Sequence, residues 1–79
     1  MASSLEIIRQ RLAEQMGIDI EMIQAETDIA DDLGADSLDA VELIIALEDE
    51  FHLTIDVVDS EQLKTVGDVA QLVDRLNAG

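Results

Sequence analysis

The chain has 79 residues, and its 19 Asp and Glu against 4 Lys and Arg give a formal net charge of −15. This length allows one domain with a single core but not a deep enzyme pocket. The absence of cysteine excludes a disulfide framework, a thiolate nucleophile and a cysteine-type zinc site. The negative charge argues against nucleic acid or anionic lipid as a partner.

The composition predicts an aliphatic core, because 48% of the residues are hydrophobic and Phe51 is the only aromatic one. No run approaches the ~20 apolar residues that span a bilayer, and the first residues resemble neither a signal peptide nor a transit peptide. We therefore expect a cytoplasmic protein without membrane insertion. Between Leu12 and Leu63 there is no Lys or Arg but there are 16 acidic residues. This interval should attract partners with basic patches.

Apolar residues at helical spacing predict a first helix from about 4 to 16. Ser3 and Glu6 have the spacing of a capping box at its start, and Gly17 is typical of its end. From Ile18 to Ala35 the periodicity is lost. A loop of this length is unusual in a small domain, so we expect it to be functional or to contain a helical turn of its own.

The second predicted helix begins at Ser37 or Leu38 and ends near Phe51 or His52. Its helical wheel has a broad apolar arc made of Leu38, Val41, Ile44, Ile45, Leu47 and Phe51. The opposite, solvent-facing arc holds Asp39, Glu42, Asp49 and Glu50. Glu48 is an exception, because it projects into the middle of the apolar arc.

The rest of the chain predicts two more helices. One is a short helix from Asp56 to Leu63 with Asp56 as its cap, although two valines weaken it. The other begins at Thr65, which forms a capping-box pattern with Asp68, and ends before Asn77 and Gly79. The predicted fold is all-α: a small antiparallel four-helix bundle of three long helices and one short one, forming a single domain over 1–79.

Ser37 stands where a tight turn meets a helix, so its hydroxyl is a candidate for chemistry. The only histidine, His52, is at the far end of the same predicted helix, roughly 22 Å away at ~1.5 Å per residue, which excludes Ser–His catalysis. Taken alone, Ser37 could be a helix N-cap, and Asp36 with Asp39 could be a solvated helix start. Its acidic context and the lack of a catalytic partner favour a serine that another protein modifies.

The loop between the first two helices is rich in aspartate but is not a calcium site. In an EF-hand register starting at Asp28, the third position is Ala30 and the sixth is Leu33, which do not fit the required ligand and glycine. We therefore predict no metal site.

The whole chain resembles the type II acyl carrier proteins of fatty acid synthesis. The resemblance rests on the run 31–39 (Asp-Asp-Leu-Gly-Ala-Asp-Ser-Leu-Asp), then 41–43, 46–51 and 65–68. It implies that Ser37 is the attachment point of 4′-phosphopantetheine, which a phosphopantetheinyl transferase transfers from coenzyme A. The thiol of this arm would hold acyl groups as thioesters, so the missing sulfur would come with the cofactor. The chain itself would not be an enzyme.

The resemblance also implies an acidic face that engages the basic patches of fatty acid synthesis enzymes in turn. The residues that match this face are Asp36, Asp39, Glu42, Glu48 and Asp49. Fast, weak contacts of a monomer would suit such a shuttle. In the family, growing acyl chains can withdraw into a cavity between the helices, and an aliphatic bundle could open one.

The chain departs from the family pattern after the second helix, where Ile55-Asp56-Val57-Val58 replaces the more usual Ile-Pro-Asp-Glu. Ile29 and Ile45 stand where many members have Phe and Met. Specialised polyketide and D-alanyl carriers remain alternatives. A protein of another class, an acidic adaptor that binds basic proteins without being modified, is a further alternative.

Overall fold

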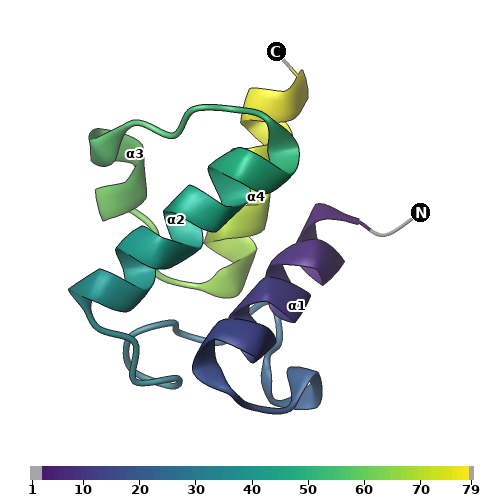
Figure 1. Ribbon diagram of the computed structural model, residues 1–79, viewed down its shortest axis with the longest axis vertical. Helices are drawn as coiled ribbons and strands as arrows, with labels where there is room; N and C mark the ends of the chain where they lie inside the picture. The colour runs from purple at the N-terminus through teal and green to yellow at the C-terminus, as the bar shows by residue number, and fades with distance from the viewer. Residues whose placement is uncertain (1–2, 79) are drawn as a thin grey trace.

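The computed structural model describes residues 3–78, which form the predicted helical bundle (Figure 1). The elements in chain order are α1 (Ser4–Met16), the short 3-10 helix η1 (Ile20–Met22), α2 (Ser37–Phe51), α3 (Val57–Glu61) and α4 (Val66–Ala78). Within 3–78 there is no strand, and one isolated bridge joins Asp28 and Thr65. The prediction of three long helices, one short helix and a long first loop is therefore confirmed.

Helix α1 begins and ends at the residues that the sequence indicated. The Ser3 side chain accepts a hydrogen bond from the Glu6 N–H at 3.2 Å, which is one half of the predicted capping box. The Glu6 carboxylate pairs with Arg9 at 3.0 Å. At the other end Gly17 adopts φ 67°, a left-handed conformation that glycine reaches without a Cβ penalty, and its N–H donates to the Ala13 carbonyl.

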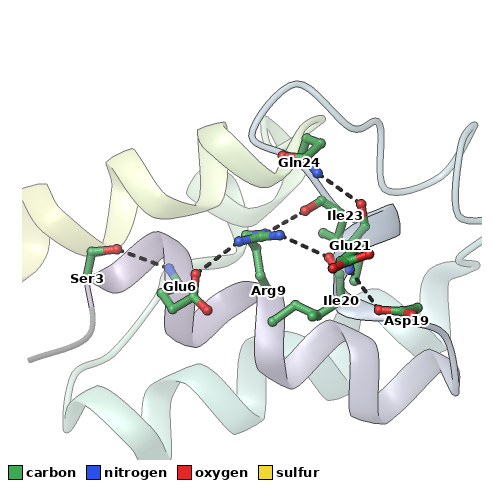
Figure 2. A network of polar contacts seen from close by, with 8 residues as sticks. All are labelled: Ser3, Glu6, Arg9, Asp19, Ile20, Glu21, Ile23 and Gln24. Atoms are coloured by element: carbon green, nitrogen blue, oxygen red, sulfur yellow. Dashed lines mark hydrogen bonds and ion pairs between the residues drawn. The ribbon is translucent and has the colours of Figure 1, made fainter.

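The long loop after α1 contains the expected helical turn, η1, and Arg9 fastens it to α1 (Figure 2). Arg9 Nε donates to the Ile23 carbonyl at 2.5 Å, and Nη2 donates to the Ile20 carbonyl at 3.1 Å. The Asp19 side chain caps η1 by accepting from the Glu21 N–H at 3.1 Å. One guanidinium thus binds two loop carbonyls: that of Ile23, and that of Ile20, which also accepts the closing bond of η1 from the Ile23 N–H at 3.0 Å.

The second half of this loop is tied to the segment that leads into α4. The Ile29 N–H donates to the Lys64 carbonyl, and the Val66 N–H donates to the Thr27 carbonyl, both at 3.0 Å. Backbone hydrogen bonds therefore hold the loop in place where no regular sheet is available.

The core is aliphatic, as predicted, and draws on every long helix. Its buried hydrophobic residues are Ile8, Leu12, Ile23, Ile29, Leu43, Leu47, Ile55, Val66, Val69, Ala70, Leu72 and Val73. Helix α1 packs against both α4 and α2, while α3 lies on the other side of α2 in Figure 1. The partly buried side chains of Leu5, Met16, Ile44 and Phe51 pack around this core.

The predicted apolar arc of α2 is wrong for three of its members. Leu38, Val41 and Ile45 are 63%, 53% and 58% exposed, whereas Leu43 and Leu47 are buried. A helix on a small core buries only a stripe on the order of 100° wide, and contacts with other helices decide which stripe that is. Because α2 is apolar over a wider arc than this, its sequence alone did not reveal the rotation.

Helix α3 is shorter than the predicted span from Asp56 to Leu63. Asp56 occupies the N-cap position, but its side chain makes no capping hydrogen bond. After Glu61 the chain closes with an i→i+3 bond from the Gln62 N–H to the Asp59 carbonyl at 3.2 Å, which ends the α-helical pattern. Helix α4 continues through Asn77 to Ala78, so the predicted end before Asn77 is wrong, because an exposed asparagine lowers helix propensity only slightly. Gly79, which was expected to follow the helix, lies outside the described residues.

Candidate functional site

Ser37 is the first residue of α2, and the residue before it caps the helix. Asp36 Oδ1 accepts from the Asp39 N–H at 2.9 Å, and Asp39 Oδ2 accepts from the Asp36 N–H at 3.2 Å, so the two carboxylates form a reciprocal capping box. The alternative in which Ser37 is the N-cap is therefore wrong. Asp36 occupies the N-cap position because Asp39 lies three residues later and its carboxylate can accept from the Asp36 N–H in return.

The Ser37 hydroxyl is consequently available. Ser37 is exposed, and its hydroxyl has no hydrogen-bond partner within residues 3–78. The backbone of the first turn of α2 is nevertheless held in place, because Gln15 Nε2 of α1 donates to the Asp39 carbonyl at 2.7 Å. A fixed backbone with a free hydroxyl suits a group that another protein must find and modify.

His52 lies at the opposite end of α2 from Ser37. It is the C-cap, with φ 54° in the left-handed region, and its N–H donates to the Glu48 carbonyl. Fifteen residues of α-helix separate the two ends, roughly 22 Å at ~1.5 Å per residue. The geometry therefore agrees with the sequence argument that His52 is not a base for Ser37.

The exposed face of α2 is mixed, with acidic and apolar side chains. Glu42 and Asp49 are both exposed, and the exposed apolar residues Leu38, Val41 and Ile45 lie on the same helix. The sequence prediction included the acidic residues but assigned the apolar ones to the core. The signal that could have found them is an apolar arc too wide for so small a core to bury.

Besides Asp36, two more of the predicted face residues use their carboxylates inside the chain. Asp39, which is half-buried, belongs to the capping box described above. Glu48, also half-buried, accepts from the Ile55 N–H through Oε2 at 2.8 Å. This contact explains how a carboxylate is accommodated within the apolar arc, because it satisfies a backbone donor beside the core.

A cavity of about 920 Å³ opens between α2, α3 and the loop that precedes α2. Ser37 lies at its lining, together with Glu48 and Ile55. Its apolar lining comes mainly from Ile29, Ala35, Ala40, Val41, Leu43, Ile44, Ile45, Leu63 and Val69. Its size falls in the range of about 300–1,000 Å³ that is usual for small-molecule sites.

Metal-binding clusters and membrane-spanning helices are both absent from the part of the chain that the structure describes. Within residues 3–78 no group of three or more His, Asp or Glu side chains is arranged to hold a metal ion. None of the helices described for this chain has the length and apolarity needed to cross a membrane.

A family model described as "Phosphopantetheine attachment site" matches residues 6–73, and the chain belongs to this family. Its members are carriers rather than enzymes, and their cofactor is covalently bound 4′-phosphopantetheine.

Similar proteins agree with this assignment. An acyl carrier protein of Bdellovibrio bacteriovorus is 48% identical over 68 residues, covering 86% of this chain and 87% of the relative. A solved structure described as an acyl carrier protein from Mycobacterium tuberculosis is 38% identical with a TM-score of 0.87, covering 92% and 97% of the two chains. The acyl carrier protein from Enterococcus faecalis is 29% identical with a TM-score of 0.79, covering 92% of each chain.

Proposed function

We propose that this chain, as a single acyl carrier domain over 1–79, carries growing acyl chains in type II fatty acid synthesis. The acyl groups are thioesters of a 4′-phosphopantetheine arm attached to Ser37. The observation that carries the proposal is the exposed Ser37 hydroxyl at the first position of α2, where Asp36 supplies the cap. Since the chain has no cysteine, the arm supplies the reactive thiol.

The start of α2 favours attachment of a phosphodiester in one respect and opposes it in another. Unpaired N–H groups and the helix dipole attract a phosphate at a helix N-terminus. Asp36 and Asp39 repel it, but their carboxylates are turned into the capping box. We infer that these two residues serve helix start and partner recognition more than they stabilise the cofactor.

Partner enzymes bind the mixed face of α2. The residues of this docking face are Asp36, Asp39, Glu42 and Asp49 together with Leu38, Val41 and Ile45. Basic patches on a phosphopantetheinyl transferase and on acyl-handling enzymes complement the acidic residues, and the apolar ones add contact area. Charge complementarity accelerates association, which suits a shuttle that must leave each partner again. Glu48 matches the same acidic face in sequence, but its contact with the Ile55 N–H supports a different role for its carboxylate.

The cavity beside Ser37 holds the acyl chain. Its apolar lining and volume support this use, and Ser37 at its edge sets the origin of the arm. The same proposal includes a monomer in the cytoplasm, where a chain without cysteine suits a reducing environment.

The test is enzymatic loading followed by mass measurement. The purified apo protein is incubated with coenzyme A and a broad-specificity phosphopantetheinyl transferase, and we expect the mass to increase by one phosphopantetheine. Ser37→Ala should abolish the gain, while Ser3, Ser4 and Ser60 remain in that variant as internal controls. No gain on folded wild-type protein would support the unmodified adaptor instead. Subsequent loading by malonyl, D-alanyl or polyketide-starter transferases distinguishes the kinds of carrier.

A further inference from the structure

Glu48 makes an internal contact that the docking face does not use. Its Oε2 accepts from the Ile55 N–H at 2.8 Å, across the turn that leaves α2. Ile55 is a core residue, 7% exposed, and stands two residues before α3 begins at Val57. The hydrogen bond thus joins the last turns of α2 to the segment that leads into α3.

Helix α3 is short, and the contacts described for it within residues 3–78 are weak. It has five residues, far fewer than the ~12–15 that make an isolated helix even marginal. Its N-cap Asp56 makes no side-chain capping bond, and α3 has fewer close backbone contacts with other helices than α1 has with α4. In the middle of α3, Asp59 faces Arg75 at 3.9 Å, but Arg75 is 70% exposed, so this ion pair is weak.

The segment that Glu48 tethers is also a wall of the cavity. Glu48 and Ile55 both line it, and so do Glu61 and Leu63 at the end of α3. On the facing side the wall is α2 itself, with Ser37 at its start. A shift of α3 away from α2 would therefore widen the opening through which a guest molecule passes.

We propose that Glu48 is a positioning residue that holds α3 closed over the cavity and so controls how fast an apolar chain enters and leaves it. The inference rests on the proposed function in that the guest is the acyl chain. An ionised carboxylate is a stronger acceptor than a neutral oxygen, and the half-buried position limits competition from water. Glu42 and Asp49, on the same helix, make no such bond and can therefore serve as matched controls.

The first measurement is amide hydrogen exchange at Ile55 in the apo protein. In Glu48→Ala the exchange of this amide should be about tenfold faster, the loss expected for a hydrogen bond to a charged group. Glu48→Gln retains a neutral acceptor oxygen, which is weaker than a carboxylate, so its rate should lie between those of wild type and Glu48→Ala, while Glu42→Ala should leave the rate unchanged. The core amides of Val69 and Val73 report global unfolding. An unchanged Ile55 rate in Glu48→Ala, or equal acceleration of the core amides, would overturn the proposal.

The second measurement follows a guest in the cavity without any modification of Ser37. The uncharged apolar fluorophore N-phenyl-1-naphthylamine is bound to the apo protein, and its dissociation is followed by stopped flow. Dissociation should be about tenfold faster in Glu48→Ala than in wild type or Glu42→Ala, since the same hydrogen bond to a charged group is lost. Equal rates, or no binding to wild type, would refute control by Glu48. Failure to load Ser37 would instead appear only in the mass measurement.

Discussion

At the scale of single residues, the division of labour between Asp36 and Ser37 is the feature that shapes the site. Both residue types are good N-caps, and they are adjacent in the sequence. Because Asp36 accepts from the Asp39 N–H and Asp39 returns a bond, the helix start is satisfied without the serine. The stability of α2 therefore does not depend on a hydrogen bond from the Ser37 hydroxyl.

Replacing the cap should therefore destabilise the protein without removing the serine. We expect Asp36→Ala to lower the free energy of unfolding by about 1 kcal/mol, the usual cost of losing an N-cap side chain. Urea denaturation monitored by circular dichroism measures the change. Glu42→Ala removes the same charge from an exposed site without a hydrogen bond, and it should change stability by much less. Equal effects of the two substitutions would show that charge, not capping, is responsible.

At the scale of elements, the helix ends were more predictable than the faces that the helices bury. Ser3, Gly17 and the pair Thr65 and Asp68 act at short range, so local sequence reveals them. The rotation of α2 depends on its packing against α1 and on the shared core, and the short α3 follows a segment that Glu48 contacts through the Ile55 N–H.

Some contacts that hold the elements together leave no local pattern at all. The Gly67 N–H donates to the Ala25 carbonyl at 2.7 Å, and a Cβ on Gly67 would lie 3.0 Å from that oxygen. Neither residue belongs to a motif that would pair it with the other. The functional site was also only partly predictable. The motif around Ser37 was visible in the sequence, whereas the cavity and the exposed apolar residues of α2 depend on how the helices pack.

The start of α4 gives the protein a defined acid sensitivity. Asp68 Oδ2 accepts from the Thr65 and Lys64 N–H groups at 3.0 and 3.1 Å, and these bonds hold the pKa of Asp68 below its ordinary value. The stabilisation is complete above the unfolded pKa, near 4, and is lost as pH falls through the lower folded pKa.

We therefore expect the stability of Asp68→Asn to depend less on pH than that of wild type between about pH 5 and pH 2. Urea denaturation at a series of pH values measures both slopes. Glu42→Gln, which removes an exposed carboxylate without such bonds, should leave the slope close to wild type. Parallel curves for Asp68→Asn and wild type would contradict the assignment.

At the scale of the whole molecule, the few cations are already committed to acidic partners. Arg9 pairs with Glu6 and Arg11 pairs with Glu50. Lys64 and Arg75 lie 3.8 and 3.9 Å from Asp28 and Asp59. The Arg11 contact joins α1 to α2 and raises the pKa of Arg11. With a net charge of −15, the remaining acidic residues repel one another and weaken the folded state.

Screening this repulsion should stabilise the fold. We expect the melting temperature to rise by about 5 °C as sodium chloride increases from about 0.01 M to about 1 M, over which the Debye length falls from about 30 to about 3 Å. Most of the rise should occur at the lower concentrations and then level off. A flat profile, or a rise that only begins at high salt, would show that self-repulsion is not the cause.

The position of Ser37 at the first turn, rather than at the cap, has a thermodynamic consequence. Esterifying its hydroxyl removes no hydrogen bond described within residues 3–78, so any linkage of the attachment to unfolding comes from interactions that the arm adds, including those of its phosphate with the helix N-terminus, Asp36 and Asp39. Any difference in melting temperature between the apo, holo and acylated forms then measures the interactions that the phosphopantetheine arm or its acyl group adds. The melting temperature of the apo protein can thus serve as the reference against which binding of the arm and of the acyl group to the folded chain is measured.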